Sequence, residues 1–183
     1  MKNKNLTQIA LMIALLIVLG AIPGIPIGII PVPIVLQNFG IILASLLLGG
    51  KKGTITIAIF LFLAAIGLPI LSGFRGGLAV FLGPTGGYLL AWLLTPSVLA
   101  GLTQLTQRIL GRPLNWFSTT AVTLVVGIVF IYLIACSWLA VQSHMPFSTA
   151  LSANLLFIPG DVIKIIIAVT VAKRLRKIIP INN

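Results

Sequence analysis

The chain has 183 residues, of which 59% are hydrophobic and only 7% are charged. A soluble domain carries about 25% charged residues, and a soluble chain this short could not hide so much apolar surface, so we expect lipid to be its solvent. Lys and Arg outnumber Asp and Glu by 12 to 1, for a net charge of +11. The basic residues form small clusters between apolar blocks, which favours a multi-span membrane protein over a nucleic-acid-binding one.

A bilayer-spanning helix needs about 17–25 residues. Six apolar segments approach this length, at residues 6–22, 33–49, 54–71, 86–106, 118–142 and 151–174. The first resembles a signal peptide, but its apolar run is long and no A-x-A-type site follows, so we expect a retained helix. The sequence predicts an all-α bundle of six transmembrane helices, formed by residues 1–183 as a single domain.

The distribution of basic residues predicts the orientation, because loops rich in Lys and Arg stay in the cytoplasm. With six spans, Arg75 is the only basic residue in an outward loop, and Lys164 lies within the last span. The cytoplasmic side then carries Lys2, Lys4, Lys51, Lys52, Arg108, Arg112, Lys173, Arg174, Arg176 and Lys177. We therefore expect both termini to be cytoplasmic.

The outward loops cover residues 23–32, 72–86 and 143–150. The first two are rich in Gly and Pro, yet they contain apolar residues such as Ile30 and Phe74. Irregular backbone at membrane depth persists only where protein or a cavity shelters it. We interpret these two loops as covers over an outward-facing ligand pocket, with plain connectors as the alternative.

The last span holds Asp161, the only acidic residue in the chain, and Lys164. A spacing of three places both on one helix face, and ionisable residues within spans are functional by default. Lys164 is expected to offer an ammonium to an anionic ligand, while Asp161 accepts ligand N–H groups or holds the lysine. The alternative is a neutralised pair that only ties the helix to the bundle.

Further polar candidates gather at the outward ends of the second, fourth and sixth spans. Asn154 precedes Asp161 by about two turns if the helix continues through Pro159, and Tyr88 offers a hydroxyl unless it is only an interfacial aromatic. The remaining candidates are Gln37, Thr85, Phe74 and Arg75, the last of which either touches ligand or caps a solvated loop. Few polar anchors among apolar walls suit a partly apolar ligand with one carboxylate and N–H and C=O groups.

Two further observations concern partners and chemistry. Ala10 and Ala14 lie four apart on the first span, a spacing that permits close helix–helix contact. The chain has no P-loop, no Cys/His metal spacing and no visible nucleophile–base set. We expect a protein that is not an enzyme, needs no cofactor and cannot hydrolyse ATP itself.

The chain resembles the BioY family, the biotin-specific substrate-binding (S) components of energy-coupling factor (ECF) vitamin transporters. The resemblance rests on PVPIVLQNFGIILASLLLG at 31–49, GLPILSGFRGGLAVFLGPTGGYLLAW at 67–92 and FIPGDVIK at 157–164. It implies a six-helix fold in a prokaryotic plasma membrane, with biotin as the transported ligand. It also implies a transmembrane coupling subunit, met through Ala10 and Ala14, and two cytoplasmic ATPase subunits. A self-sufficient secondary carrier is the alternative, although a single acidic residue makes a coupling-ion site difficult.

Overall fold

The computed structural model describes residues 2–26, 28 and 30–178, and the regular secondary structure within them is helical. The first half forms α1 (Lys2–Gly20), α2 (Gln37–Ala65), α3 (Leu78–Leu82) and α4 (Gly86–Leu110). The second half forms α5 (Trp116–Leu124), the π-helix η1 (Val125–Phe130), α6 (Ile131–Gln142), α7 (Phe147–Asn154), the 3₁₀-helix η2 (Leu155–Phe157) and α8 (Ile158–Ile178). The described residues form no strand, only isolated bridges between Ile25 and Ile34 and between Leu71 and Arg75.

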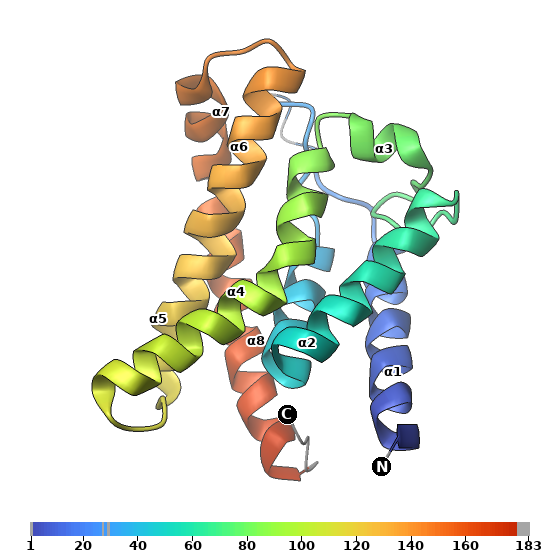
Figure 1. Ribbon diagram of the computed structural model, residues 1–183. Coiled ribbons are helices and arrows are strands. Elements are labelled where there is room, and N and C mark those ends of the chain that lie inside the picture. Colours follow the sequence, from blue (N-terminus) through green and yellow to red (C-terminus); the bar gives the residue numbers. More distant parts are fainter. Residues whose placement is uncertain (1, 27, 29, 179–183) are drawn as a thin grey trace.

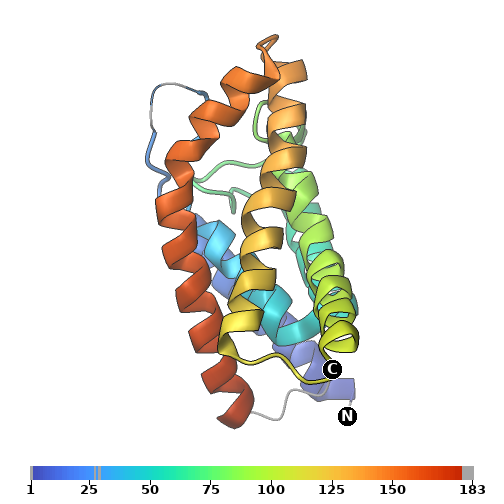
Figure 2. The same cartoon turned by 90° about the vertical axis from the view of Figure 1, so that its left-hand side faces the viewer.

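Several of these elements join into longer rods (Figures 1 and 2). α5, η1 and α6 run without a break, as do α7, η2 and α8. Among the described residues, 4 helices are long and apolar enough to cross a membrane: Gln37–Ala65, Gly86–Leu110, Trp116–Gln142 and Phe147–Arg176. The first predicted span corresponds to a shorter apolar helix, Lys4–Gly20. The prediction of an all-helical membrane protein is confirmed at this level.

The second and third predicted spans correspond to the two legs of α2, before and after a kink. The loop predicted between them is wrong, because the helix continues through the kink. The legs meet directly at a kink at Gly49, whose φ of 72° and ψ of −169° are non-helical. Glycine allows this conformation because it has no Cβ. Lys51 and Lys52 follow the kink on the second leg and so belong to a helix rather than to a loop. Figure 1 shows the resulting V.

The predicted loops also differ from the structure. The second span begins at Gln37 rather than at residue 33, because the proline-rich stretch before it stays extended and pairs Ile25 with Ile34. The loop at 72–86 contains α3. The loop at 143–150 is shorter than predicted, since α7 begins at Phe147, directly after Pro146. Proline favours a helix start because it lacks the N–H that a first turn leaves unsatisfied.

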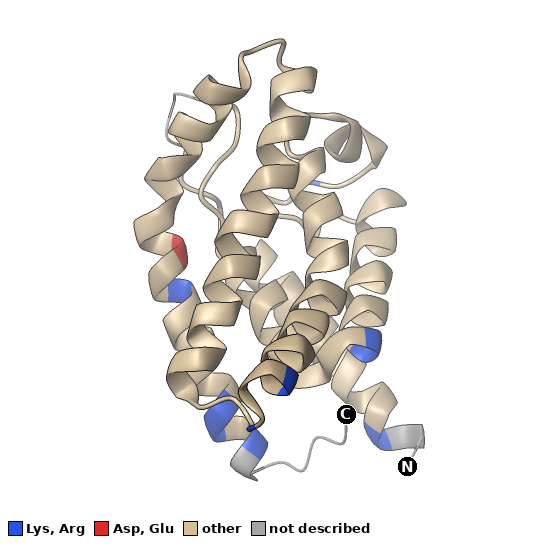
Figure 3. Ribbon diagram, turned by 60° about the vertical axis from the view of Figure 1, so that its left-hand side comes forward, with Lys and Arg blue, Asp and Glu red and all other residues tan. Residues whose placement is uncertain are grey.

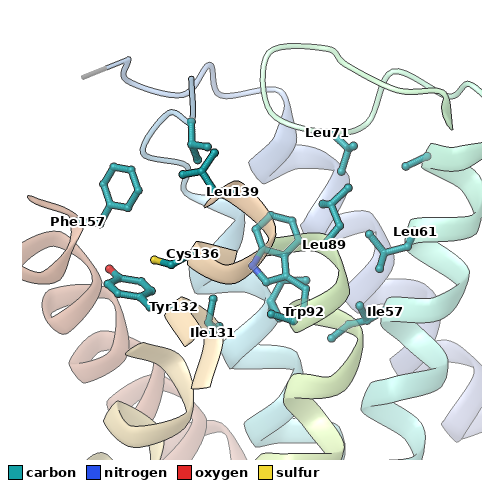
Figure 4. Packing of buried hydrophobic residues seen from close by; sticks show 14 of the residues in the cluster. Ile57, Leu61, Leu71, Leu89, Trp92, Ile131, Tyr132, Cys136, Leu139 and Phe157 are labelled. Atoms are coloured by element: carbon teal, nitrogen blue, oxygen red, sulfur yellow. The ribbon is translucent and has the colours of Figure 1, made fainter. Parts of the chain in front are cut away.

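α2 lies at the centre of the bundle and packs against α1, α4 and α8. One apolar cluster includes Phe60, Trp92, Ile131 and Leu139 from α2, α4 and α6 (Figure 4). The other lies nearer the α2 kink and includes Leu43, Val169 and Ala172. These buried faces hold the helices that carry the site.

The charged residues are distributed unevenly along the bundle (Figure 3). The start of α1 and the end of α8 lie at one end of the molecule, together with the α2 kink (Figure 1). Lys and Arg gather at this end, which we call the basic end, while Arg75 lies in the loop before α3. The bundle therefore has the charge asymmetry that the sequence predicts.

Candidate ligand-binding site

Asp161 and Lys164 form an ion pair in the first two turns of α8. Lys164 Nζ lies 2.9 Å from Asp161 Oδ1 and also donates a hydrogen bond of 2.9 Å to the carbonyl of Val35. Asp161 is 4% exposed and therefore buried. The pair thus connects α8 to the stretch that leads into α2, through a contact that the sequence does not reveal.

Tyr132 completes the environment of the carboxylate. Its hydroxyl donates a hydrogen bond of 2.8 Å to Asp161 Oδ2, so both carboxylate oxygens have partners. Tyr132 follows the π-helix η1, which changes the rotation of the helix between α5 and α6. Such π segments often mark functional sites. Tyr132 was not among the residues predicted from sequence, because one tyrosine in an apolar helix has no distinguishing pattern.

The ion pair lies in the wall of a cavity enclosed by the 32–38 stretch, the 71–80 loop, α4, α6 and α8. The space open to the centres of water-sized molecules is about 60 Å³. Apolar side chains form most of the wall, among them Leu71, Leu89, Trp92, Ile131 and Phe157, which Figure 4 labels. Figure 4 also shows Tyr132, whose hydroxyl reaches Asp161.

Tyr88 and Asn154 lie together, but only Tyr88 lines the cavity. The Tyr88 hydroxyl donates to Asn154 Oδ1, and Asn154 Nδ2 donates to the carbonyl of Ala150 at 2.8 Å. Asn154 is fully buried behind the wall. Asn154 therefore positions Tyr88. It lies behind the cavity wall, whereas the sequence predicts that it contacts the ligand directly.

Gln37 lines the cavity but has its polar atoms engaged by backbone. Its Nε2 donates to the carbonyls of Leu16 at 3.0 Å and Ile70 at 2.9 Å, and its Oε1 accepts from the N–H of Ser72 at 2.9 Å. The side chain therefore joins α1, α2 and the loop before α3. This geometry gives Gln37 a structural role in holding the wall.

The three remaining candidates divide into two groups. Arg75 and Thr85 line the cavity; Arg75 Nε donates to the carbonyl of Ser72 at 3.1 Å, and Thr85 Oγ1 to that of Val80 at 3.3 Å. Phe74 does not line the cavity, because it lies at the loop tip with φ 57° and is 66% exposed. A positive φ turns the chain sharply at that position.

Two further wall residues carry buried polar atoms without a partner in the described part of the chain. They are Asn38 Oδ1 and Trp92 Nε1, an acceptor and a donor. Leaving such an atom unpaired costs about 1–3 kcal/mol, which makes each a candidate contact for a bound molecule. Asn38 could have been selected as an amide beside Gln37, whereas nothing in the sequence distinguishes Trp92 from an ordinary core aromatic.

The arrangement favours binding over catalysis. It offers one ammonium, one carboxylate, two tyrosine hydroxyls and unpaired amide and indole atoms between apolar walls. No group of three or more His, Cys, Asp or Glu residues able to hold a metal occurs in the described chain. Ala10 and Ala14 lie elsewhere, on the exposed face of α1.

Together, the apolar helices and the charged cavity define an integral membrane protein with an internal small-molecule site. The chain belongs to the BioY family, whose model matches residues 1–181. The resemblance noted in the sequence is thereby confirmed. The family is one of transporter components and not of enzymes, which also confirms that the protein is not an enzyme.

Similar proteins match over nearly their whole length. A biotin transporter BioY from Lactococcus lactis subsp. cremoris is 50% identical over 96% of this chain and 92% of its own. A probable biotin transporter BioY from Pyrococcus horikoshii is 40% identical over 96% of this chain and 98% of its own. The crystal structure of the S-component for biotin from an ECF-type ABC transporter superimposes with a TM-score of 0.90, at 49% identity over 96% of this chain and 92% of that one.

Proposed function

We propose that residues 1–183 act as one biotin-binding S component of an ECF-type, ATP-driven vitamin uptake transporter. The observation that carries this proposal is the buried Asp161–Lys164 pair in the wall of a mostly apolar cavity, in a chain of this family. Biotin suits such a site because it combines a carboxylate, a ureido group with N–H and C=O, and an apolar thioether ring. No cofactor takes part.

In this proposal, the principal polar contacts of biotin are Lys164, Asp161 and Tyr88. Asn38 and Trp92 join them because each has an unpaired polar atom. Arg75 and Thr85 contact the ligand from the outer side. Asn154 and Gln37 act through Tyr88 and the backbone rather than directly. Phe74, at the exposed loop tip, contacts the ligand only if the loop folds inward.

Biotin must pass the segments that cover the cavity in order to enter it. Among the described residues, 21–26, 30–36 and 66–77 lie outside long helices, so these segments are the best able to move. Their movement would also open the Val35–Lys164 hydrogen bond and free the ammonium. We infer that these segments close over biotin and exclude water.

The membrane setting follows from charge. The basic end faces the cytoplasm, so both termini are cytoplasmic, six spans cross a prokaryotic plasma membrane and the cavity opens outward. The exposed α1 face with Ala10 and Ala14 meets a transmembrane coupling subunit, and two cytoplasmic ATPases supply energy. Lipid surrounds the remaining faces, and nucleic acid has no role.

Equilibrium biotin binding to the purified chain in detergent tests the proposal. Wild-type protein is expected to bind tightly and Lys164→Ala much more weakly, with folding checked by size exclusion and circular dichroism. Uptake into vesicles with and without the ATP-driven partners then separates this function from a secondary carrier. Absence of biotin binding by folded wild type would overturn the assignment, and ion-driven uptake without partners would favour the carrier.

A further inference from the structure

The last turns of α4 project from the bundle and lead into a short turn before α5. None of residues 100–110, all of which the structure describes, is buried. Figure 1 shows this part of α4 reaching the edge of the molecule at the basic end, where the chain turns into α5. We call residues 105–117 the α4–α5 corner. Most of its side chains face the surroundings of the protein rather than other helices.

Exposed apolar side chains form a stripe along α4 that ends at this corner. Leu90, Leu94, Leu105 and Ile109 are spaced by 4 and 11 residues, which brings them to nearly the same side of the helix. Ile109 is 75% exposed, and Phe117 at the start of α5 is 76% exposed. In a chain of a membrane transporter family, we expect such a stripe to contact the acyl chains of lipids.

Two arginines lie where the stripe ends. Arg108 is in the last turn of α4, and Arg112 follows Gly111, which ends the helix in the left-handed conformation with a φ of 63°. Both arginines are exposed. The only acidic side chain of the chain, Asp161, belongs to the ion pair of α8. A carboxylate side chain of this protein therefore does not neutralise either arginine.

The turn into α5 is held by its own polar groups. Asn115 Oδ1 accepts hydrogen bonds from the N–H and the hydroxyl of Ser118, each at 2.8 Å. Trp116 Nε1 donates to Thr170 Oγ1 at 3.2 Å, and the Phe117 ring packs edge-on against Trp116 with centroids 5.0 Å apart. The corner thus keeps its shape without these two arginines, whose guanidinium groups point to an external partner.

We propose that the α4–α5 corner binds an anionic phospholipid. The acyl chains lie against Leu105 and Ile109, and the phosphate accepts hydrogen bonds from Arg108 and Arg112, because a guanidinium group matches phosphate oxygens with parallel N–H donors. Basic residues at a membrane surface favour anionic over zwitterionic lipids, whose head groups carry a cation of their own. The apolar stripe that runs into the corner favours a lipid over an acidic protein. The site is independent of the proposed biotin function, since it shares no residue with the biotin cavity.

The test uses the full chain, delipidated in neutral detergent, with the thermal unfolding temperature as the readout. Phosphatidylglycerol is titrated against phosphatidylcholine with the same acyl chains. The corner variant Arg108→Gln/Arg112→Gln is compared with Lys51→Gln/Arg174→Gln, which removes equal charge from exposed positions of the basic end outside the corner. Assembly of each variant with the partner subunits of the transporter is measured in parallel.

We expect phosphatidylglycerol to raise the unfolding temperature of the wild type more than phosphatidylcholine does. The apparent affinity for phosphatidylglycerol should fall at least about fivefold in the corner variant, because two basic contacts are lost, and stay unchanged in the control. Equal responses to the two lipids, or an equal loss in both variants, would overturn the proposal. An undiminished lipid response of the corner variant together with lost assembly would also overturn it, in favour of a protein partner.

A second pair of variants covers the case in which the double arginine variant fails to fold. Ile109→Gln keeps every charge and removes an apolar contact at the corner, whereas Val141→Gln removes an equally exposed side chain, 77% against 75%, at the end of α6. Weaker binding of phosphatidylglycerol by Ile109→Gln alone supports the site, because a purely ionic attraction would not respond to this change. Unchanged affinity of the Ile109 variant would refute it.

Discussion

At the scale of single residues, identical chemistry serves different purposes according to its partners. Gln37 and Asn38 are neighbouring amides in the wall of the first cavity. Gln37 makes three hydrogen bonds to backbone, whereas Asn38 Oδ1 has no partner among the described residues. The first is therefore expected to act on stability and the second on ligand affinity.

Replacing each amide by leucine separates these roles. Gln37→Leu leaves buried backbone groups unpaired, so we expect it to lower the free energy of unfolding by about 2–4 kcal/mol. Asn38→Leu removes an unsatisfied acceptor, so stability should change little while biotin affinity falls. Equilibrium unfolding in mixed micelles and biotin titration measure the two effects. Similar losses of stability in both variants would contradict the assignment.

Asp161 and Lys164 require a cycle of variants, because each supports the other. Asp161→Asn leaves a partly buried ammonium without its carboxylate, which we expect to cost about 3 kcal/mol of stability. The double variant Asp161→Asn/Lys164→Met removes both charges and should regain part of that loss. Biotin binding should stay weak in both, since the ammonium or its partner is missing. Recovery of affinity together with stability would show that the pair has only a structural role.

At the scale of elements, glycines show which helix surfaces approach closely. A Cβ on Gly20 would lie 2.1 Å from the Ile70 carbonyl oxygen and 2.5 Å from Gln37 Nε2. A Cβ on Gly127 in η1 would lie 2.8 Å from Ile165 Cδ1. Gly101 in α4 has open space around it. The end of α1 and the middle of η1 therefore approach their separate neighbours closely only because glycine has no side chain. Gly101 makes no such close approach.

Alanine substitutions at two of these glycines should have opposite effects. Gly20→Ala is expected to destabilise the fold and to displace Gln37, because its neighbour is rigid backbone. Gly101→Ala is expected to stabilise the fold by up to about 1 kcal/mol, since alanine favours helix. Thermal unfolding of both variants in one detergent checks this. Destabilisation by Gly101→Ala would show that the open face of α4 carries a contact that the monomer lacks.

At the scale of the whole molecule, the bundle separates three regions. The first cavity lies away from the basic end, a second cavity with polar lining lies within that end, and α1 packs on α2 at the side of the bundle. Ala10 and Ala14 belong to the outer face of α1, beside exposed Leu11 and Val18. We therefore expect that the cavity and the outer face of α1 can be altered independently.

Larger side chains on α1 should interrupt coupling alone. Ala10→Leu/Ala14→Leu is expected to keep biotin affinity but to abolish most ATP-driven uptake, because the partner helices are held further away. Ala121→Leu, an exposed position on α5, is the matched control. Vesicle uptake with the partner subunits and binding in detergent give the two readouts. Full uptake by the α1 variant would show that Ala10 and Ala14 do not contact the partner subunit.

Much of this molecule could be predicted from sequence because the evidence was local. Apolar length gave the helices, charge clusters gave the two unlike ends, and the spacing of Asp161 and Lys164 gave their contact. The break after the second predicted segment was also recognised, but not its form. A glycine kink and a loop look alike in sequence, and only the φ of 72° at Gly49 distinguishes them.

The sequence by itself determined that the chain is a helical membrane protein with one buried carboxylate–ammonium pair, since composition and helical periodicity act over short distances. The tertiary structure alone decided what surrounds that pair. Tyr132 reaches Asp161 across 29 positions, Val35 reaches Lys164 across 129, and Asn154 reaches Tyr88 across 66. Such contacts depend on how the helices pack. A buried polar group without a partner costs free energy, so each group forms a hydrogen bond with the partner that lies nearest after packing.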